Sequence, residues 1–303
     1  MFSELSTAGL IGVRGPDAAA FLQAQLTSDV AALPMLHTQY SGYCSPKGRV
    51  LATFIVWNLP DAILLQLPAE LREPIQIRLK KYVLRAKVEL SDATAAYRLF
   101  GVWHALERLH DLAPDLPKAM HEVTSDDEVF VARVPGERFL VLTAAGQAPR
   151  VRAVLSRESP EEPPEAWMRL DIAAAIPVIT AQTHDAFIPQ MLNLDALGAV
   201  SYSKGCYPGQ EIVARTRYLG RLKQRLYPVR IASRSVSAGD TLYSAVFGAE
   251  QATGTVVNAV AESAESSRAL AVIQTAAAGA ELHWKSLDGP PVQLEPLPYT
   301  LPQ

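Results

Sequence analysis

A short loop rich in glycine holds the residue best suited to covalent chemistry in this chain. The segment KGCYPGQE at residues 204–211 places Cys206 among two glycines and a proline, which allow and stiffen a tight turn. Lys204 precedes it and Arg215 follows, and positive charge nearby favours a thiolate. We therefore expect Cys206 and Lys204 to be the catalytic residues. The alternative is an inert buried thiol, because most cysteines behave as small hydrophobes.

The other residues capable of covalent or metal chemistry serve mainly to exclude classes of site. Cys44 is the only other cysteine, too few for a disulfide framework or a four-cysteine zinc site, and no Cys-x-x-Cys pair supports a thiol oxidoreductase. The six histidines lack metal-ligand spacing, so we predict no metal site. Cys44 begins the turn 44–49, and if that turn and the loop 204–211 face one cavity, the two sulfurs could lie close together.

Length and composition indicate a globular protein of two or three domains. The chain has 303 residues, of which 49% are hydrophobic and 19% charged. The net charge of -3 argues mildly against a protein built to hold nucleic acid. Residues 1–10 carry no Lys or Arg, and no run of about 18 apolar residues exists. We expect no secretion signal, no membrane contact and a cytoplasmic location.

Apolar spacing predicts the elements that must position the loop. The first block contains a helix from Asp17 to about Ser28, a hairpin of strands Val50–Trp57 and Ala62–Leu67, a helix beginning near Pro74, and a strand at Ala86–Leu90. The second block contains a helix near Val102–Leu109, strands near Val129–Val134 and Phe139–Thr143, and an acidic, proline-rich linker at 156–165. This order indicates an α+β fold with largely antiparallel sheets.

The region after Arg225 has a different residue pattern. Short β-like runs alternate with Gly and Ser turns, which is typical of a small closed barrel. We place a domain boundary near 222, giving domains 1–222 and 223–303.

The loop 204–211 resembles the signature of the YgfZ family, folate-binding relatives of the glycine-cleavage T protein, and matches the pattern K-G-C-Y-x-G-Q-E at every fixed position. Weaker similarity extends over residues 10–230. The similar segments are LTSDV at 26–30, CSPKGR at 44–49, YVLR at 82–85 and FIPQMLNLD at 187–195.

This resemblance implies both a fold and a function. The fold would be a folate-binding portion of two ferredoxin-like units followed by a small β-barrel. The ligand would be tetrahydrofolate or a derivative. The role would be accessory, in assembling or repairing iron–sulfur clusters and so indirectly supporting tRNA modification, with iron–sulfur assembly proteins or cluster enzymes as partners. Because clusters usually need about four protein ligands, one thiol would hold a cluster only transiently or with another chain.

The resemblance also points to residues that would hold the pterin ring. Trp167 offers a flat face for stacking, although a tryptophan there could equally belong to the core. Gln25, Gln190 and Asn193 carry amides that match the donor–acceptor edge of a pterin. Each amide alone could instead be a surface or capping residue.

Cations could bind the glutamate tail of the folate, because arginine pairs with carboxylates in a bidentate manner. Lys47, Arg49 and Arg85 have this role in our prediction, with a solvated turn as the alternative. The remaining cofactor-binding candidates lie in or just after the signature loop. They are Tyr207, Gln210, Glu211 and Arg215.

Two other functions stay open. A folate-dependent aminomethyltransferase needs a carboxylate near the folate, and residues 50–53 contain none, but Asp171 lies in a segment similar to one in the T protein. The basic stretch 215–230 includes Arg217, Arg221 and Arg225 and could contact RNA. A solvated face is the preferred interpretation of that stretch, and we expect no direct nucleic-acid binding.

Overall fold

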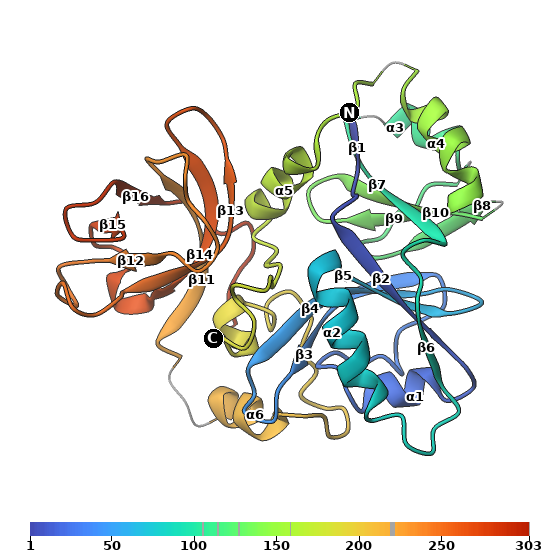
Figure 1. The fold of residues 1–303 in the computed structure, drawn as a ribbon, viewed down its shortest axis with the longest axis horizontal. Helices are drawn as coiled ribbons and strands as arrows, with labels where there is room; N and C mark the ends of the chain where they lie inside the picture. Colours follow the sequence, from blue (N-terminus) through green and yellow to red (C-terminus); the bar gives the residue numbers. More distant parts are fainter. Residues whose placement is uncertain (105, 114, 127, 158, 219–221, 303) are drawn as a thin grey trace. The chain divides into compact units, whose positions relative to one another are not determined.

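Three β-assemblies make up the chain (Figure 1). The structure is a computed structural model that describes residues 1–104, 106–113, 115–126, 128–157, 159–218 and 222–302. Two assemblies are five-stranded sheets and the third is a closed barrel. The contacts group the chain into two compact units. Unit 1 comprises Met1–Ala24, Asp29–Tyr40 and Phe54–Trp167, and unit 2 comprises Gln25–Ser28, Ser41–Thr53 and Met168–Gln303.

The first sheet has the order β3-β4-β5-β2-β6. Its strands are β2 (Ala8–Arg14), β3 (His37–Cys44), β4 (Val50–Asn58), β5 (Ile63–Pro68) and β6 (Glu89–Asp92). Antiparallel pairing of β4 with β5 confirms the predicted hairpin. The strand predicted at Ala86–Leu90 starts three residues later, because Ala86 closes a turn by donating its backbone N–H to the Val83 carbonyl.

Helix α1 (Ala18–Gln23) is shorter than its sequence predicted. Asp17 occupies the N-cap position but makes no side-chain cap, because its carboxylate accepts the backbone N–H of Lys87 at 2.7 Å. The helix ends at Gln23, so Gln25 lies beyond it and not on its apolar face. The prediction that this helix reaches Ser28 was wrong.

Helix α2 (Ala69–Lys80) begins before Pro74, which lies inside it. The predicted start near Pro74 rested on the preference of proline for a first helical turn. The spacing of buried Leu71, Ile75 and Leu79 extends the apolar face towards the N-terminus instead, and burial of that face outweighs the cost of one missing hydrogen bond.

The second sheet has the order β1-β7-β10-β9-β8. Its strands are β1 (Phe2–Glu4), β7 (Tyr97–Trp103), β8 (Val123–Asp126), β9 (Val129–Val134) and β10 (Arg138–Ala144). Helices α3 (Leu106–His110), α4 (Ala148–Leu155) and α5 (Pro164–Ala173) and the 3₁₀ turn η1 (Ala145–Gln147) accompany it. The predicted start of a helix at Val102 was wrong, because Val102 and Trp103 are the last residues of the buried strand β7. A short apolar run of this kind is compatible with a strand or with a helix.

The predicted linker at 156–165 is tied to the first strand of the chain. Phe2 donates its N–H to the Pro160 carbonyl and accepts the N–H of Glu162, while α5 begins at Pro164.

The barrel closes in the order β11-β14-β13-β12-β15-β16. Its strands are β11 (Gln224–Ile231), β12 (Thr241–Tyr243), β13 (Gly254–Ala261), β14 (Ser267–Gln274), β15 (Leu282–Trp284) and β16 (Pro291–Leu294). A 3₁₀ turn, η3 (Thr275–Ala277), follows β14, and β16 was missed from sequence. The α+β fold with a closed C-terminal barrel is confirmed. The boundary at 222 stays a prediction, since unit 2 joins the barrel to earlier segments.

Among the described helices, none combines the length and the apolar character needed to cross a bilayer.

Candidate functional site

Cys206 is exposed and stands between two buried neighbours in unit 2. Lys204 is 8% exposed and Tyr207 is 6% exposed. No atom would contact a Cβ added at Gly205, so the tip of the loop is open. Helix α6 (Gln210–Tyr218) starts within the last two residues of the segment 204–211. The structure therefore presents this thiol to solvent, and the alternative of a buried Cys206 is excluded.

The ammonium of Lys204 fixes one side of the loop. Its Nζ donates to the Leu26 carbonyl at 2.6 Å and to the Ser28 carbonyl at 2.8 Å, and lies 5.2 Å from the centre of the Tyr207 ring. Charge-assisted hydrogen bonds of this kind are among the stronger ones in proteins. Lys204 thus joins the loop to residues 26–28 of the same unit.

Two glycines let the turn 44–49 pack against the cysteine loop. Gly209 has φ +79°, and a Cβ there would come within 2.5 Å of the Ser45 carbonyl oxygen and 2.6 Å of the Gly48 Cα. Gly48 has φ +70°, and a Cβ there would come within 2.8 Å of the Ile212 Cβ in α6. Only glycine tolerates both the left-handed backbone and this approach. The segments that carry the two cysteines therefore adjoin.

Cys44 differs sharply from Cys206, because only 1% of it is exposed. Burial, followed by the negative charge of Asp185, raises the pKa of the Cys44 thiol to about 12. Asp185 lies at the same turn and accepts a hydrogen bond from Ser45 Oγ at 2.8 Å. Asp185 was not predicted from sequence, since 140 residues separate it from Ser45 and no motif marks it.

Tyr207, within the loop, and Tyr202, just before it in the chain, form a phenolic cluster. The Tyr207 hydroxyl is buried and has no hydrogen-bond partner among the residues that the structure describes. Burial raises the pKa of Tyr207, and the neighbouring Cys44 and Tyr202 add to the effect. Burial also raises the pKa of Tyr202, whose ring lies 4.1 Å from the guanidinium carbon of Arg217.

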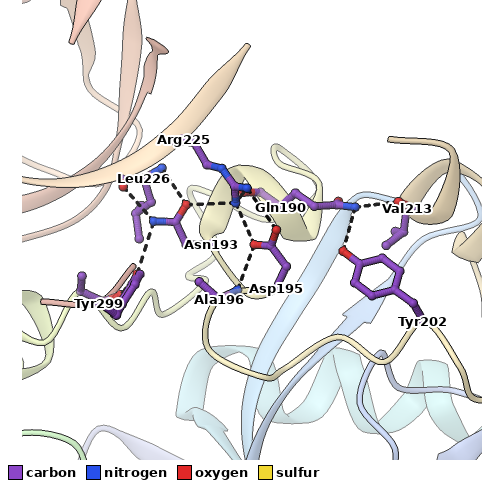
Figure 2. A network of polar contacts seen from close by, with 10 residues as sticks. Gln190, Asn193, Asp195, Ala196, Tyr202, Val213, Arg225, Leu226 and Tyr299 are labelled. Atoms are coloured by element: carbon purple, nitrogen blue, oxygen red, sulfur yellow. Dashed lines mark hydrogen bonds and ion pairs between the residues drawn. The ribbon is translucent and has the colours of Figure 1, made fainter. Parts of the chain in front are cut away.

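Gln190 connects this cluster to α6. It lies in the 3₁₀ turn η2 (Pro189–Leu192) and is 3% exposed. Its Nε2 donates to the Val213 carbonyl at 2.6 Å and to the Tyr202 hydroxyl at 3.3 Å (Figure 2). Within the described part of the chain, its Oε1 has no partner, and neither does Oε1 of Gln25, which is 8% exposed. Buried polar atoms normally have a partner, so each of these two oxygens keeps an unused capacity to accept a hydrogen bond.

Asn193, by contrast, is fully engaged in holding the structure together. It follows η2 in a left-handed conformation with φ 56°. Its Nδ2 donates to the Leu226 carbonyl at 2.9 Å and to the Tyr299 hydroxyl at 3.3 Å, while its Oδ1 accepts the Leu226 N–H at 3.4 Å (Figure 2). Its amide therefore ties η2 to β11.

The solvated-face interpretation was wrong for Arg225. Its side chain is 11% exposed, binds Asp195 at 2.8 Å and donates to the Gln190 carbonyl at 2.9 Å (Figure 2). Burial raises the pKa of nearby Tyr299 to about 12. Sequence spacing offered no signal for this group, because its members come from three separate segments. Arg221 lies outside the described residues.

The other candidates in unit 2 lie mostly at the surface. Lys47, Arg49, Glu211 and Arg215 are exposed, whereas Gln210 is half-buried and begins α6. Arg49 donates to the Ala186 carbonyl.

Two predicted site residues, Trp167 and Arg85, belong to unit 1. Trp167 is 6% exposed, and a Cβ on Gly101 would overlap its ring at 2.1 Å. The guanidinium carbon of Arg138 lies 4.6 Å from the ring centre. These contacts give Trp167 a core role in unit 1. Arg85 is exposed. Ligand contact by either residue stays a prediction.

Comparisons with known proteins agree with this architecture. No family model matches the chain. A solved structure of the glycine cleavage system aminomethyltransferase T from Bartonella henselae has a similar fold, with a TM-score of 0.74 at 17% identity over 98% of this chain and 85% of that one.

Relatives with closer sequences carry the name "tRNA-modifying protein YgfZ". The protein from Klebsiella pneumoniae (strain 342) is 33% identical over 96% of this chain and 90% of its own length. The one from Serratia proteamaculans (strain 568) is 32% identical over the same shares. Similarity of this degree across nearly the whole of both chains shows that the chain belongs to the YgfZ family.

Proposed function

We propose that this protein binds tetrahydrofolate or a derivative, and that it serves as an accessory factor for iron–sulfur cluster assembly or repair, and thereby for tRNA modification, through the Cys206 thiol. One observation carries the proposal: the exposed thiol of Cys206 is followed directly in the chain by Tyr207, whose buried hydroxyl has no partner among the described residues. An exposed cysteine between buried Lys204 and Tyr207 can meet another protein, whereas Cys44 cannot.

The donor and acceptor pattern of the site suits a reduced pterin. Such a ring carries N–H and amino donors, and Gln25 Oε1, Gln190 Oε1 and the Tyr207 hydroxyl are acceptors without partners. Asn193 drops out of this set because its amide is already used. The cations Lys47, Arg49 and Arg215 are exposed and suit the carboxylates of a glutamate tail.

Folate binding is tested by titration with tetrahydrofolate and its derivatives, followed by tryptophan fluorescence and calorimetry. We expect saturable binding that weakens about tenfold or more in Gln190→Leu, which removes the unpartnered acceptor. Val246→Ala, an exposed change in the barrel, is the matched control. Absence of binding by the unchanged protein at physiological folate concentrations would refute the folate assignment.

The thiol role is tested by complementation of a strain that lacks its own family member. Cys206→Ser should abolish complementation while fold and folate affinity persist. Cys44→Ser, the change at the buried cysteine, should retain activity if the protein folds. Full complementation by Cys206→Ser would count against a role for the exposed thiol.

A second function, folate-dependent aminomethyl transfer, is favoured by one observation. Asp185 places a carboxylate at the turn 44–49, where the sequence had suggested none. An assay for glycine synthesis from an aminomethyl-lipoyl donor and tetrahydrofolate separates the two functions. Turnover that disappears in Asp185→Asn would establish the transferase, and absence of turnover would leave the accessory role.

A further inference from the structure

We infer that ligand binding at the unpartnered acceptors and chemical modification of Cys206 are coupled through Tyr207 and Gln190. Ligand binding then changes the free energy of modifying the thiol, and modification changes the free energy of ligand binding. This inference rests on the proposed function and specifies how its site is regulated.

Tyr207 provides the direct link. It follows Cys206 immediately in the chain, and its buried hydroxyl has no hydrogen-bond partner. Lys204 lies on the other side of the thiol in the chain. Its Nζ is 5.2 Å from the centre of the same ring and donates hydrogen bonds to the carbonyls of residues 26 and 28. A ligand that donates to or accepts from this hydroxyl must therefore fix the residue beside the thiol.

Gln190 provides a second link through helix α6. The amide nitrogen is bound to the Val213 carbonyl at 2.6 Å, so the orientation of the side chain follows the position of the helix. The opposite atom of the same amide, Oε1, is the unpartnered acceptor. Because α6 begins four residues after Cys206, a ligand bound to this oxygen also restrains the helix that ends the cysteine loop.

Both links meet at Tyr202. Its hydroxyl accepts a hydrogen bond from Gln190 Nε2 at 3.3 Å, and Tyr202 also contributes to raising the pKa of Tyr207. Gln190 Oε1 and the Tyr207 hydroxyl therefore belong to side chains that are tied to the loop carrying the thiol, one through α6 and one through the chain itself. Two sites coupled in this way must influence each other by the same factor at equilibrium.

The test measures this factor in both directions, with 5-formyltetrahydrofolate as the ligand and glutathione as the thiol probe. In a glutathione redox buffer, the Cys206 thiolate displaces one glutathione thiolate from glutathione disulfide, giving a mixed disulfide. We expect saturating ligand to lower the equilibrium constant of this exchange about fivefold or more. The mixed disulfide should weaken ligand binding by the same factor. A Cys44→Ala background confines the reaction to Cys206.

Tyr207→Phe removes only a hydroxyl that has no partner among the described residues, so the protein should fold, and the factor should fall to the part that the Gln190 link supplies. Tyr218→Phe is the matched control: it lies at the far end of α6, is 68% exposed, and should keep the full factor. Ligand affinity that is identical with and without the mixed disulfide overturns the inference and leaves folate binding intact. Failure of the unmodified protein to bind any folate overturns the proposed function instead, and the inference with it.

Discussion

The two cysteines of this chain lie in adjoining segments yet occupy opposite environments. Cys44 ends strand β3 and is sealed in the core, where burial raises the pKa of its thiol to about 12. Cys206 lies on the open side of the loop that packs against the same turn. The same type of side chain is therefore a core residue at position 44 and an accessible nucleophile at position 206, because neighbouring residues bury only the first.

The largest expected difference is in thiol reactivity. At pH 8 a thiol with a pKa of about 12 is ionised to a fraction on the order of 10⁻⁴, and burial blocks the reagent as well. We expect Cys206 to react with an aromatic disulfide at least about a thousandfold faster than Cys44. Single-cysteine variants followed by mass spectrometry give both rates. Rapid native-state labelling of Cys44 would remove the contrast.

The glycines on either side of Cys206 should differ strongly in tolerance. Gly209→Ala puts a side chain on a left-handed residue and against the backbone of the turn 44–49, so we expect a loss of about 4 kcal/mol in unfolding free energy. Gly205→Ala meets no atom within 4 Å and should change that free energy by less than about 0.5 kcal/mol. Urea unfolding compares the two variants, and equal losses would contradict the close packing of the two segments.

Lys204 should matter for stability more than an exposed lysine of the adjoining turn. Lys204→Met removes two hydrogen bonds to buried carbonyls, and we expect it to lower the unfolding free energy by about 2–3 kcal/mol. Lys47→Met, at an exposed position, should cost less than about 0.5 kcal/mol. Should Lys204→Met prove neutral in the same unfolding assay, the ammonium does not hold the loop.

The smallest effect is a pH dependence that belongs to Cys44. Its pKa is raised from 9.0 to about 12 in the folded chain, so the unfolded chain loses this proton first. The stabilisation is complete below pH 9 and declines above it, by at most about 1.4 kcal/mol per pH unit. Relative to Cys44→Ala, the unchanged protein should lose stability between pH 9 and 10, whereas the difference between them should be constant below pH 8. A constant difference throughout would show that the thiol is not buried.

Sequence patterns predicted the fold better than the roles of polar side chains. The hairpin β4–β5, strands β9 and β10 and the closed barrel follow from apolar spacing and turn residues, which act over short stretches of chain. Errors occurred where two local signals competed, as at Pro74 in α2 and Val102 in β7. There, burial by distant parts of the chain decided the outcome.

The polar site shows the same division. Gln25, Gln190 and Asn193 looked equivalent as amides, yet Asn193 alone has its donors and acceptors filled, by β11 and Tyr299. Arg225 looked like one cation in a solvated stretch, but it forms a buried pair with Asp195. No local pattern separates such cases, since their partners come from other segments.

The sequence by itself determined that a cysteine stands on a tight glycine loop, because glycine and proline constrain the backbone of their immediate neighbours. The tertiary structure alone decided that Lys204 reaches Leu26 across 178 residues, that Cys44 is sealed while Cys206 is open, and that particular acceptors remain unpartnered. Burial and hydrogen bonding depend on which distant segments meet, and those meetings are fixed by packing of the whole chain.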